Sequence, residues 1–314
     1  MNHYINLNRI EFVITHACSG SCRHCSNGDM LSGRTSVDLA AAQNTIRCLT
    51  DVYPVQSVMT FGGEPMLYTD TVCGIHRSAS RNGVTNRQLI TNGYFSTKGS
   101  VIDEAAKKLC DAGVNDVLIS VDVFHQESIP LEPVERFAAA LIRNGIPSLR
   151  VHPAWVINRD HDNPLNRETR RLIHLFAEKG IPANEGNIVF PSGNAVKYLS
   201  EYFPPRETID LSRPCGSEPY TERPDKVSSL SVNPNGDIII CAAVIGNMYQ
   251  NDIYRIIQNY NPYQNPALRA VLTGGVTGLL DYAWSLGMVL DISDCGSACG
   301  ICRKVMTSLT AKGS

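Results

Sequence analysis

The sequence is poor in charged residues and has no surplus of positive charge. Only 18% of its 314 residues are Asp, Glu, Lys or Arg, and the formal net charge is −2. It contains no basic tail and no dense run of Lys and Arg. Non-specific nucleic-acid binding needs such a basic patch, because contacts to phosphates supply most of the affinity. We therefore expect no nucleic-acid partner.

Long apolar segments are also missing. The most apolar late run, GLLDYAWSLGMVL, is interrupted by Asp281. No segment reaches the roughly 18 uninterrupted apolar residues that a membrane helix needs. The first residues, MNHYINLNRIEF, are polar and lack the apolar stretch of a signal peptide. These features predict a cytoplasmic protein without a membrane partner.

Cysteine, in contrast, is abundant. The chain holds 11 cysteines, and in a reducing compartment they should not form a disulfide framework. Metal or redox chemistry is the better interpretation. The first cluster has the spacing C-x3-C-x2-C, which is one ligand short of the four that structural zinc sites and iron–sulfur clusters use. Its members are Cys18, Cys22 and Cys25, and five more cysteines lie at Cys215, Cys241, Cys295, Cys299 and Cys302.

Short apolar runs alternate with helical patterns over the first two thirds of the chain. We expect six strands, at residues 10–15, 55–61, 86–91, 116–121, 148–157 and 187–190, with helical segments between them. A βα unit repeated six times implies an α/β fold with a parallel sheet. In such sheets functional residues collect at the carboxyl ends of the strands.

Unusual residues follow these strand ends. The cysteine loop follows the first strand, and GGEP, residues 62–65, follows the second. TNG ends the third strand, Asp122 follows the fourth with His125 close behind, and PSGN follows the sixth. One polar strand end could be a turn. Several in succession predict the rim of one pocket, and we expect His125 to face it.

The pattern changes at about residue 204. A stretch rich in Pro and polar residues reads as a linker or extended loop, and VSSLSVNPNGDIIICAAV predicts a β-hairpin that turns at NPNG. Short helical segments and CGSACGIC follow. We therefore expect two domains, residues 1–204 and a smaller α+β domain, residues 205–314, built around cysteines.

The C-x3-C-x2-C loop and GGEP, in register with βα repeats over residues 9–195, resemble the radical S-adenosylmethionine (SAM) superfamily. The resemblance implies a partial (β/α)6 barrel in which Cys18, Cys22 and Cys25 hold a [4Fe-4S] cluster. SAM would chelate the fourth iron through its methionine amine and carboxylate, which accounts for the missing ligand. An electron, from a donor such as a flavodoxin or ferredoxin, would cleave SAM to a 5′-deoxyadenosyl radical that abstracts a hydrogen atom. The cofactor supplies the hard chemistry and the protein positions it.

The same resemblance implies the SAM contacts. Gly62, Gly63 and Glu64 would receive the methionine amine, and Pro65 would end the turn. The remaining expected contacts, to methionine, ribose and adenine, are Asn92, Ser120, Asp122 and His24. The alternative is a zinc knuckle in which His24 is the fourth ligand. Its adjacency to Cys25 makes tetrahedral closure awkward, and zinc would not explain GGEP.

The C-terminal cysteines resemble a related pattern. Gly236 and Cys241 fit the G-x4-C that begins the cysteine-rich C-terminal domains of many radical SAM peptide-modifying enzymes, in a shortened, twitch or SPASM-like form. This implies a second, auxiliary [4Fe-4S] cluster, whose ligands would be Cys241, Cys295, Cys299 and Cys302. Cys215 is then left over. Two alternatives are that Cys215 is a ligand and another cysteine is not, or that the site is a structural zinc ribbon.

These resemblances predict an enzyme that matures a ribosomally made precursor peptide. Epimerisation of peptide residues is the expected reaction, with the thiol of Cys215 donating the returning hydrogen atom. Thioether formation and a carbon–carbon crosslink are alternative outcomes. A radical SAM enzyme for a small molecule, a protein activase, and a non-catalytic iron–sulfur or zinc module are alternative functions.

Overall fold

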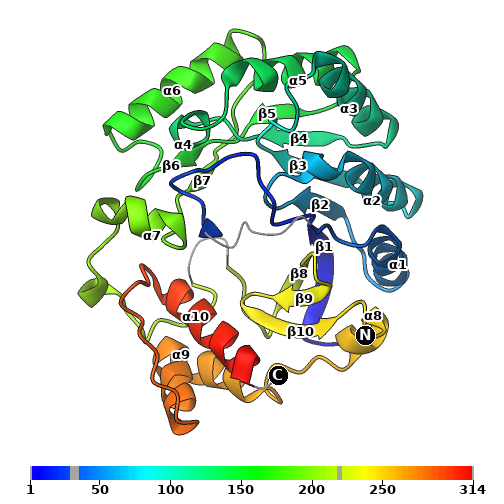
Figure 1. Cartoon of the computed structure of the whole chain (residues 1–314). Coiled ribbons are helices and arrows are strands. Elements are labelled where there is room, and N and C mark those ends of the chain that lie inside the picture. The colour runs from blue at the N-terminus through cyan, green and yellow to red at the C-terminus, as the bar shows by residue number, and fades with distance from the viewer. Residues whose placement is uncertain (1, 29–34, 218–220, 313–314) are drawn as a thin grey trace.

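A parallel sheet with helices on one side forms the larger part of the fold (Figure 1). The computed structural model describes residues 2–28, 35–217 and 221–312. Five parallel strands pair in chain order: β1 (Ile5–Val13), β2 (Ser57–Phe61), β3 (Asn86–Thr91), β4 (Asp116–Ile119) and β5 (Leu149–Val151). The α/β fold with a parallel sheet open as a partial barrel, predicted from the sequence, is confirmed.

Amphipathic helices cover the outer face of these strands. They are α1 (Leu39–Thr50), α2 (Thr69–Arg81), α3 (Gly99–Asp111), α5 (Leu131–Arg143) and α6 (Pro164–Ala177). Asp38 caps α1 by accepting a hydrogen bond from the backbone N–H of Ala41 at 2.8 Å, and Asn163 caps α6 in the same way. Their apolar faces pack on alternate strand residues such as Leu7 and Phe12, which are fully buried. Burial of this surface, at about 25 cal/mol per Å², holds the helices on the sheet.

The predicted fifth and sixth strands are shorter than expected. Residues 148–157 divide into β5 and β6 (Ala154–Trp155) around Pro153, which has no backbone N–H to continue the ladder. β6 pairs with β7 (Asn187–Ile188) in a separate two-stranded sheet. The barrel is therefore open beyond β5, and the chain from β7 onward turns back toward the cysteine loop.

The C-terminal part extends the same sheet. The predicted hairpin forms β8 (Val227–Val232) and β9 (Asp237–Ile240), with Gly236 at the turn in a positive-φ conformation, φ 86°. β8 pairs in parallel with β1, so the order is β10-β9-β8-β1-β2-β3-β4-β5. The sequence did not indicate β10 (Ala243–Asn247). Three helices follow, α8 (Ile253–Gln258), α9 (Pro266–Ser285) and α10 (Ala298–Lys312).

Short helical turns occupy several strand ends. They are η2 (Pro65–Tyr68), α4 (Val123–Gln126), α7 (Asn194–Tyr198), η3 (Ser200–Tyr202) and η4 (Arg206–Thr208). Within the three described ranges, every helix is too short or too polar to cross a membrane.

Candidate functional site

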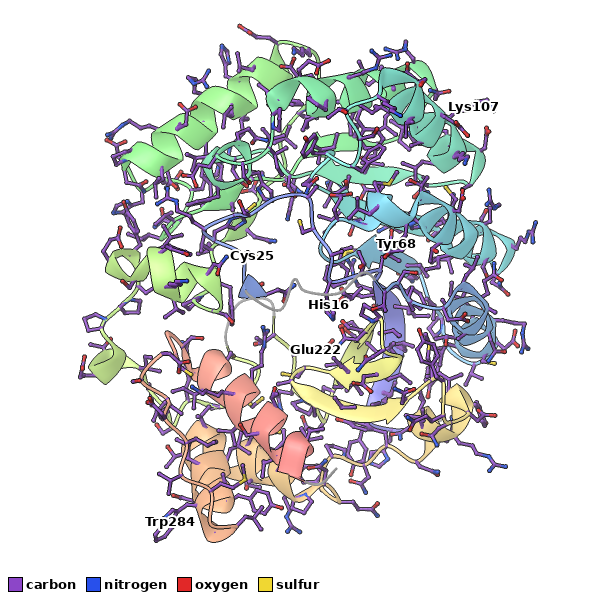
Figure 2. The ribbon with its side chains drawn as sticks, viewed as in Figure 1. His16, Cys25, Tyr68, Lys107, Glu222 and Trp284 are labelled. Atoms are coloured by element: carbon purple, nitrogen blue, oxygen red, sulfur yellow. The ribbon has the colours of Figure 1, made fainter. Side chains whose placement is uncertain are left out.

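The first cysteine loop follows β1 at the carboxyl end of the sheet. Burial and the neighbouring charges of Asp122, Cys18 and Cys25 raise the pKa of the Cys22 thiol. The backbone N–H of Gly20 lies 3.4 Å from the sulfur of Cys18, and the Cys25 N–H donates to the Cys22 carbonyl at 3.2 Å. These contacts fold the loop back on itself, and the three cysteines lie near enough for their charges to act on one another. Figure 2 shows Cys25 and His16 in the central part of the molecule.

The GGEP turn packs directly against this loop. The N–H of Gly63 donates to the carbonyl of Thr15, and that of Glu64 to the carbonyl of Ala17, each at 2.8 Å. A Cβ atom at position 63 would lie 2.0 Å from the Ala17 carbonyl oxygen, and Gly62 has a φ of +136°. Only glycine permits this approach. The turn after β2 thus fixes the start of the cysteine loop.

Glu64 is fully buried beneath the turn. Its Oε1 accepts hydrogen bonds from the Met66 N–H at 2.9 Å and from the Thr91 hydroxyl at 2.7 Å. Its Oε2 accepts from the Asn92 N–H at 2.8 Å. Burial raises the pKa of Glu64 to about 7, although these hydrogen bonds act in the opposite direction. The side chain therefore ties the end of β2 to the end of β3.

The two other strand ends bring their predicted residues to the same edge. The amide nitrogen of Asn92 lies 3.6 Å from the Cys18 sulfur and 3.2 Å from the Ser19 hydroxyl. Ser120 is buried, and its N–H donates to the Thr91 carbonyl at 2.9 Å. The structure thus brings Asn92 to the first cysteine and places Ser120 one strand away.

Asp122 and His125 form a hydrogen-bonded pair at the end of β4. Asp122 is fully buried and accepts hydrogen bonds from the Ala154 N–H at 3.0 Å and from Nδ1 of His125 at 2.8 Å. Burial acts to raise the pKa of Asp122, but His125 outweighs it and lowers that pKa to about 2. The carboxylate fixes the orientation of the imidazole.

His24 completes this group. The centre of its ring lies 4.8 Å from the centre of the His125 ring and 4.9 Å from that of the Phe124 ring. Burial lowers the pKa of His24 to about 4. Cys22, His24 and His125 each offer a ligand atom, and these atoms lie within 4.8 Å of one another. A zinc site would draw on this trio. The zinc knuckle considered above would use the three cysteines and His24 as ligands, but not His125. It would also not explain why the GGEP turn packs so closely against the cysteine loop.

The donor set fits the group that the fold implies. Three thiols stand together on one loop, and buried polar atoms of the neighbouring strand ends surround it. The Nδ1 atoms of His16 and His24 are buried without a hydrogen-bond partner among the described residues, as is Nε2 of Gln126. Such atoms are costly unless a bound group satisfies them. A [4Fe-4S] cluster on Cys18, Cys22 and Cys25 with a polar ligand beside it matches this arrangement.

Cys215, which the expected ligand set left over, interacts with three of the other C-terminal cysteines. The thiol of Cys215 is hydrogen-bonded to Cys241, which lowers the pKa of Cys241 to about 7 and raises that of Cys215. Cys299 and Cys302, on α10, also act on Cys215 through their charges. Cys295 donates its S–H to Asp294 at 3.6 Å. The structure thus places Cys215 among the cysteines that we expected to be ligands.

Sequence reasoning overlooked two contacts of these sites. Asn194, in the PSGN stretch, donates from its side chain to the Cys22 carbonyl at 3.2 Å and from its backbone N–H to the Cys25 carbonyl at 2.9 Å. Arg303, on α10, acts through its charge to lower the pKa values of Cys241 and Cys302. The position of PSGN after a strand was a usable signal, whereas nothing in the sequence singles out Arg303.

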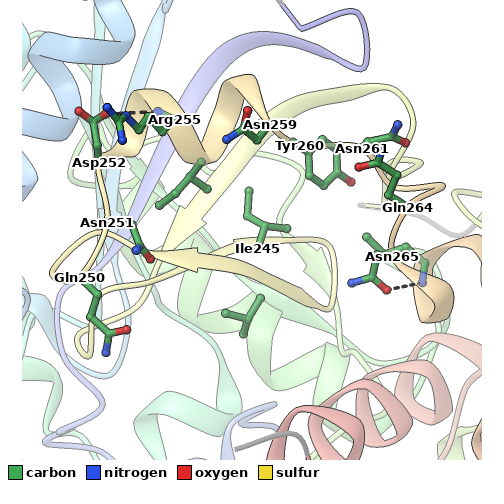
Figure 3. Close-up of a pocket in the computed structure, with 13 residues that line it drawn as sticks. Ile245, Gln250, Asn251, Asp252, Arg255, Asn259, Tyr260, Asn261, Gln264 and Asn265 are labelled. Carbon is green, nitrogen blue, oxygen red and sulfur yellow. Dashed lines mark hydrogen bonds between the residues drawn. The ribbon is translucent and has the colours of Figure 1, made fainter.

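A separate pocket of about 660 Å³ lies between β10, α8 and the start of α9 (Figure 3). Its lining is rich in amide side chains, including Gln250, Asn251, Asn259 and Gln264. Asp252 and Asn265, also in the lining, accept backbone hydrogen bonds as N-caps of α8 and α9. The pocket contains none of the residues predicted from the sequence.

Comparison with known proteins agrees with this geometry. The chain is 28% identical over 120 residues to a GTP 3′,8-cyclase of Limosilactobacillus fermentum, covering 38% of this chain and 34% of that protein. The match therefore spans about a third of that relative's length. The fold is similar to that of native anSMEcpe with bound AdoMet, at 14% identity and a TM-score of 0.50, covering 81% of this chain and 81% of that chain.

Native anSMEcpe with bound AdoMet and the Cp18Cys peptide is similar to nearly the same degree, at 13% identity and a TM-score of 0.50, covering 82% of this chain and 80% of that chain. A sequence profile described as "Radical SAM superfamily" matches residues 12–201. This range includes the cysteine loop, the GGEP turn and the ends of β3 and β4. The chain belongs to the radical SAM superfamily.

Proposed function

We propose that this radical SAM enzyme carries a second [4Fe-4S] cluster and abstracts a hydrogen atom from a ribosomally made peptide. One observation carries the proposal, namely the hydrogen bond and mutual charge effects that link Cys215, Cys241, Cys299 and Cys302. Four cysteine thiolates are the usual complete ligand set of a [4Fe-4S] cluster. When bound, the two clusters and SAM supply the radical chemistry, and the protein supplies the position of each.

The residues of the SAM site have distinct tasks in this proposal. The Gly62–Gly63 turn brings backbone groups close to the cysteine loop, and Glu64 holds that turn against the end of β3. Asp122 orients His125, whose side chain is 15% exposed and can reach a bound ligand. Fixed side chains of this kind hold a reactive group in place, because their own hydrogen bonds prevent movement.

If Cys215 is a ligand of the auxiliary cluster, the reaction that we expect is no longer epimerisation. A ligand is a thiolate and has no S–H bond to give, so it cannot return a hydrogen atom to a planar carbon radical. The hydrogen-donor role that we expected for Cys215 is incompatible with this proposal. A peptide radical without a donor nearby would instead bond to a sulfur or carbon of the same peptide, with loss of a proton from that partner and of one electron, which the auxiliary cluster would accept. We therefore favour a thioether or carbon–carbon crosslink over epimerisation.

A small-molecule substrate is the second candidate, and the likeness to GTP 3′,8-cyclase favours it. That match of 120 residues is too short to contain both the cysteine loop and the C-terminal cysteines, since Cys18 and Cys215 are 197 positions apart. The likeness to the fold of peptide-bound anSMEcpe covers 82% of this chain and thus includes part of the C-terminal segment. This extent supports a peptide substrate over a nucleotide.

Iron analysis after anaerobic reconstitution tests the second cluster. We expect about eight irons per chain, two clusters of four. Cys215→Ala should lose up to about four of them, whereas the control variant Cys48→Ala, at a cysteine outside both sites, should keep both clusters. Loss of iron in Cys295→Ala with none in Cys215→Ala would restore the original ligand set and the donor role. Four thiolates that hold one zinc and no iron would show a structural zinc site instead.

Mass spectrometry tests the substrate. The reconstituted enzyme is incubated in D2O with SAM, a reductant and either a candidate precursor peptide or GTP. A peptide that loses two hydrogens supports a crosslink, and one that gains a single deuterium supports epimerisation. Turnover of GTP without any change in the peptide would favour the small-molecule function.

A further inference from the structure

One short segment touches both cysteine sites. Residues 190–194, with the sequence FPSGN, connect β7 to α7. We call them the bridging segment. Its C-terminal half contacts the loop that carries Cys22 and Cys25, and its N-terminal half contacts the start of α10, which carries Cys299 and Cys302.

Three hydrogen bonds fasten the bridging segment to the first cysteine loop. The Asn194 side chain donates to the carbonyl of Cys22 at 3.2 Å, and the Asn194 N–H donates to the carbonyl of Cys25 at 2.9 Å. The Ser192 hydroxyl donates to the carbonyl of Ser26 at 3.3 Å. Each bond ends on a backbone carbonyl of the loop, so a shift of the segment shifts the backbone that positions two thiols.

Gly193 sets how closely the two pieces approach. Its backbone has φ 58° and ψ −130°, a conformation that residues other than glycine rarely adopt. A Cβ atom there would lie 2.6 Å from the Ser26 carbonyl oxygen and 2.7 Å from that of Cys25. Backbone atoms cannot yield as the end of a side chain can. Any residue larger than glycine must push the segment away from the loop.

The other half of the bridging segment lies against α10. A Cβ atom on Gly296 would be 2.7 Å from Cβ of Pro191, so the backbone before α10 touches Pro191 directly. The Arg303 guanidinium lies 5.7 Å from the centre of the Phe190 ring, a cation–π distance. Phe190 and Pro191 also share the wall of a cavity of about 440 Å³ with Gly296 and Cys299.

Arg303 links this contact to the second set of thiols. Arg303 follows Cys302 directly on α10, and the Cβ position of Gly300, which follows Cys299, lies 3.6 Å from the Pro191 carbonyl oxygen. The potential of an iron–sulfur cluster depends on the charges around its sulfurs. The Phe190 ring therefore contacts a charged side chain that stands next to a thiol of the second site.

We propose that the bridging segment couples the two cysteine sites, so that a displacement at the SAM-cluster loop changes the environment of the auxiliary cluster. The proposal rests on the auxiliary cluster of the proposed function. Energy passes between distant sites through packed elements that must move together, and coupling of this kind is reciprocal. Gly193, Asn194, Phe190 and Pro191 are positioning residues in this scheme, because they act on the clusters only through the chain segments that hold them.

Electron paramagnetic resonance (EPR) of the auxiliary cluster tests the coupling without reference to turnover. The background is the full chain with Cys18, Cys22 and Cys25 all changed to Ala, so that only the auxiliary cluster contributes a signal. In this background Gly193→Ala is expected to shift the g values and the midpoint potential of that signal. Gly180→Ala is the matched control, because Gly180 also has a positive φ, 77°, but nothing lies within 4 Å of its Cβ position. It should leave the signal unchanged.

A gentler variant guards against misfolding. Phe190→Leu keeps an apolar side chain and removes the ring beneath Arg303. We expect it to shift the auxiliary signal in the triple-Ala background and, by reciprocity, to shift the SAM-cluster signal in the otherwise unchanged chain. An auxiliary signal that is the same in Gly193→Ala, Phe190→Leu and the control would overturn the coupling alone. A wild-type chain with only four irons would overturn the auxiliary cluster and the coupling together.

Discussion

Replacing Glu64 with Gln changes one buried atom and should be costly. The carboxylate accepts three hydrogen bonds, two at Oε1 and one at Oε2, and offers no donor. In Gln one of these oxygens becomes an NH2 group. If that group replaces Oε2 it faces the Asn92 N–H, and if it replaces Oε1 it faces the Met66 N–H. Either orientation sets donor against donor and leaves a buried backbone N–H without a partner.

The magnitude follows from this loss. Leaving a buried donor unsatisfied costs roughly 1–3 kcal/mol. Glu64 is fully buried, so water cannot replace the lost bond. We therefore expect the free energy of unfolding to fall by about 1–3 kcal/mol. Because the side chain joins the GGEP turn to the end of β3, SAM should also bind more weakly, while the iron content stays unchanged.

Urea unfolding and a SAM-binding titration check both parts. Glu11→Gln is the matched control. The Glu11 carboxylate accepts from Arg9 at 2.7 Å and from the Ser231 hydroxyl at 2.9 Å, and the side chain is 22% exposed. The Ser231 hydroxyl can rotate to accept a hydrogen bond from the new Gln side chain. The free energy of unfolding of the control should therefore fall by less than about 1 kcal/mol. Equal stability and equal SAM affinity in Glu64→Gln and wild type would refute the reasoning.

Two further predictions follow from the described contacts. Burial lowers the pKa of His76 to about 3 from its ordinary 6.5, so the unfolded chain binds a proton below pH 6.5 that the folded chain does not. The free energy of unfolding of wild type should therefore exceed that of His76→Gln by its full amount above pH 6.5. This difference should be about 2 kcal/mol smaller at pH 5 than at pH 8. Urea unfolding at both pH values measures it. An advantage that does not change with pH would mean that His76 is charged in the fold. Gly63→Ala should lose the SAM-cluster iron, because its Cβ would lie 2.0 Å from the Ala17 carbonyl oxygen, whereas Gly274→Ala, with open space around it, should keep that iron in the same assay.

Local patterns were sufficient for most of the barrel. β3 begins and ends where the sequence predicted a strand, at Asn86 and Thr91, and α1 begins after the N-cap Asp38. These elements form where pattern, cap and burial agree. The strand ends also placed Glu64 and Asp122 at one edge, because parallel strands share the direction of their carboxyl ends. The two-residue β7 was not predictable in length, since the strand that it pairs with, in the described part of the chain, is the equally short β6 beyond Pro153.

Pairing between distant segments could not be predicted. β8 lies beside β1 although more than 200 residues separate them, and no local pattern specifies that neighbour. The grouping of Cys215 with Cys241 has the same origin, because spacing suggested that Cys295, Cys299 and Cys302 would act as one unit. In the fold, Cys299 and Cys302 lie on α10 while Cys295 precedes it. Cys295 still lies beside the first turn of α10, its Cβ 3.9 Å from the Cβ position of Gly300, so the local spacing gave no sign that Cys215 joins this motif.

Reductive cleavage of SAM tests the central claim most directly. The protein is reconstituted with iron and sulfide under anaerobic conditions, and 5′-deoxyadenosine is measured after addition of SAM and a reductant. We predict that wild type produces it and that the variant with Cys18, Cys22 and Cys25 changed to Ala produces none, having lost about four irons. Cys48→Ala, at a cysteine outside both sites, should behave as wild type. Formation of 5′-deoxyadenosine by the triple variant, or its absence from fully reconstituted wild type, would contradict the account.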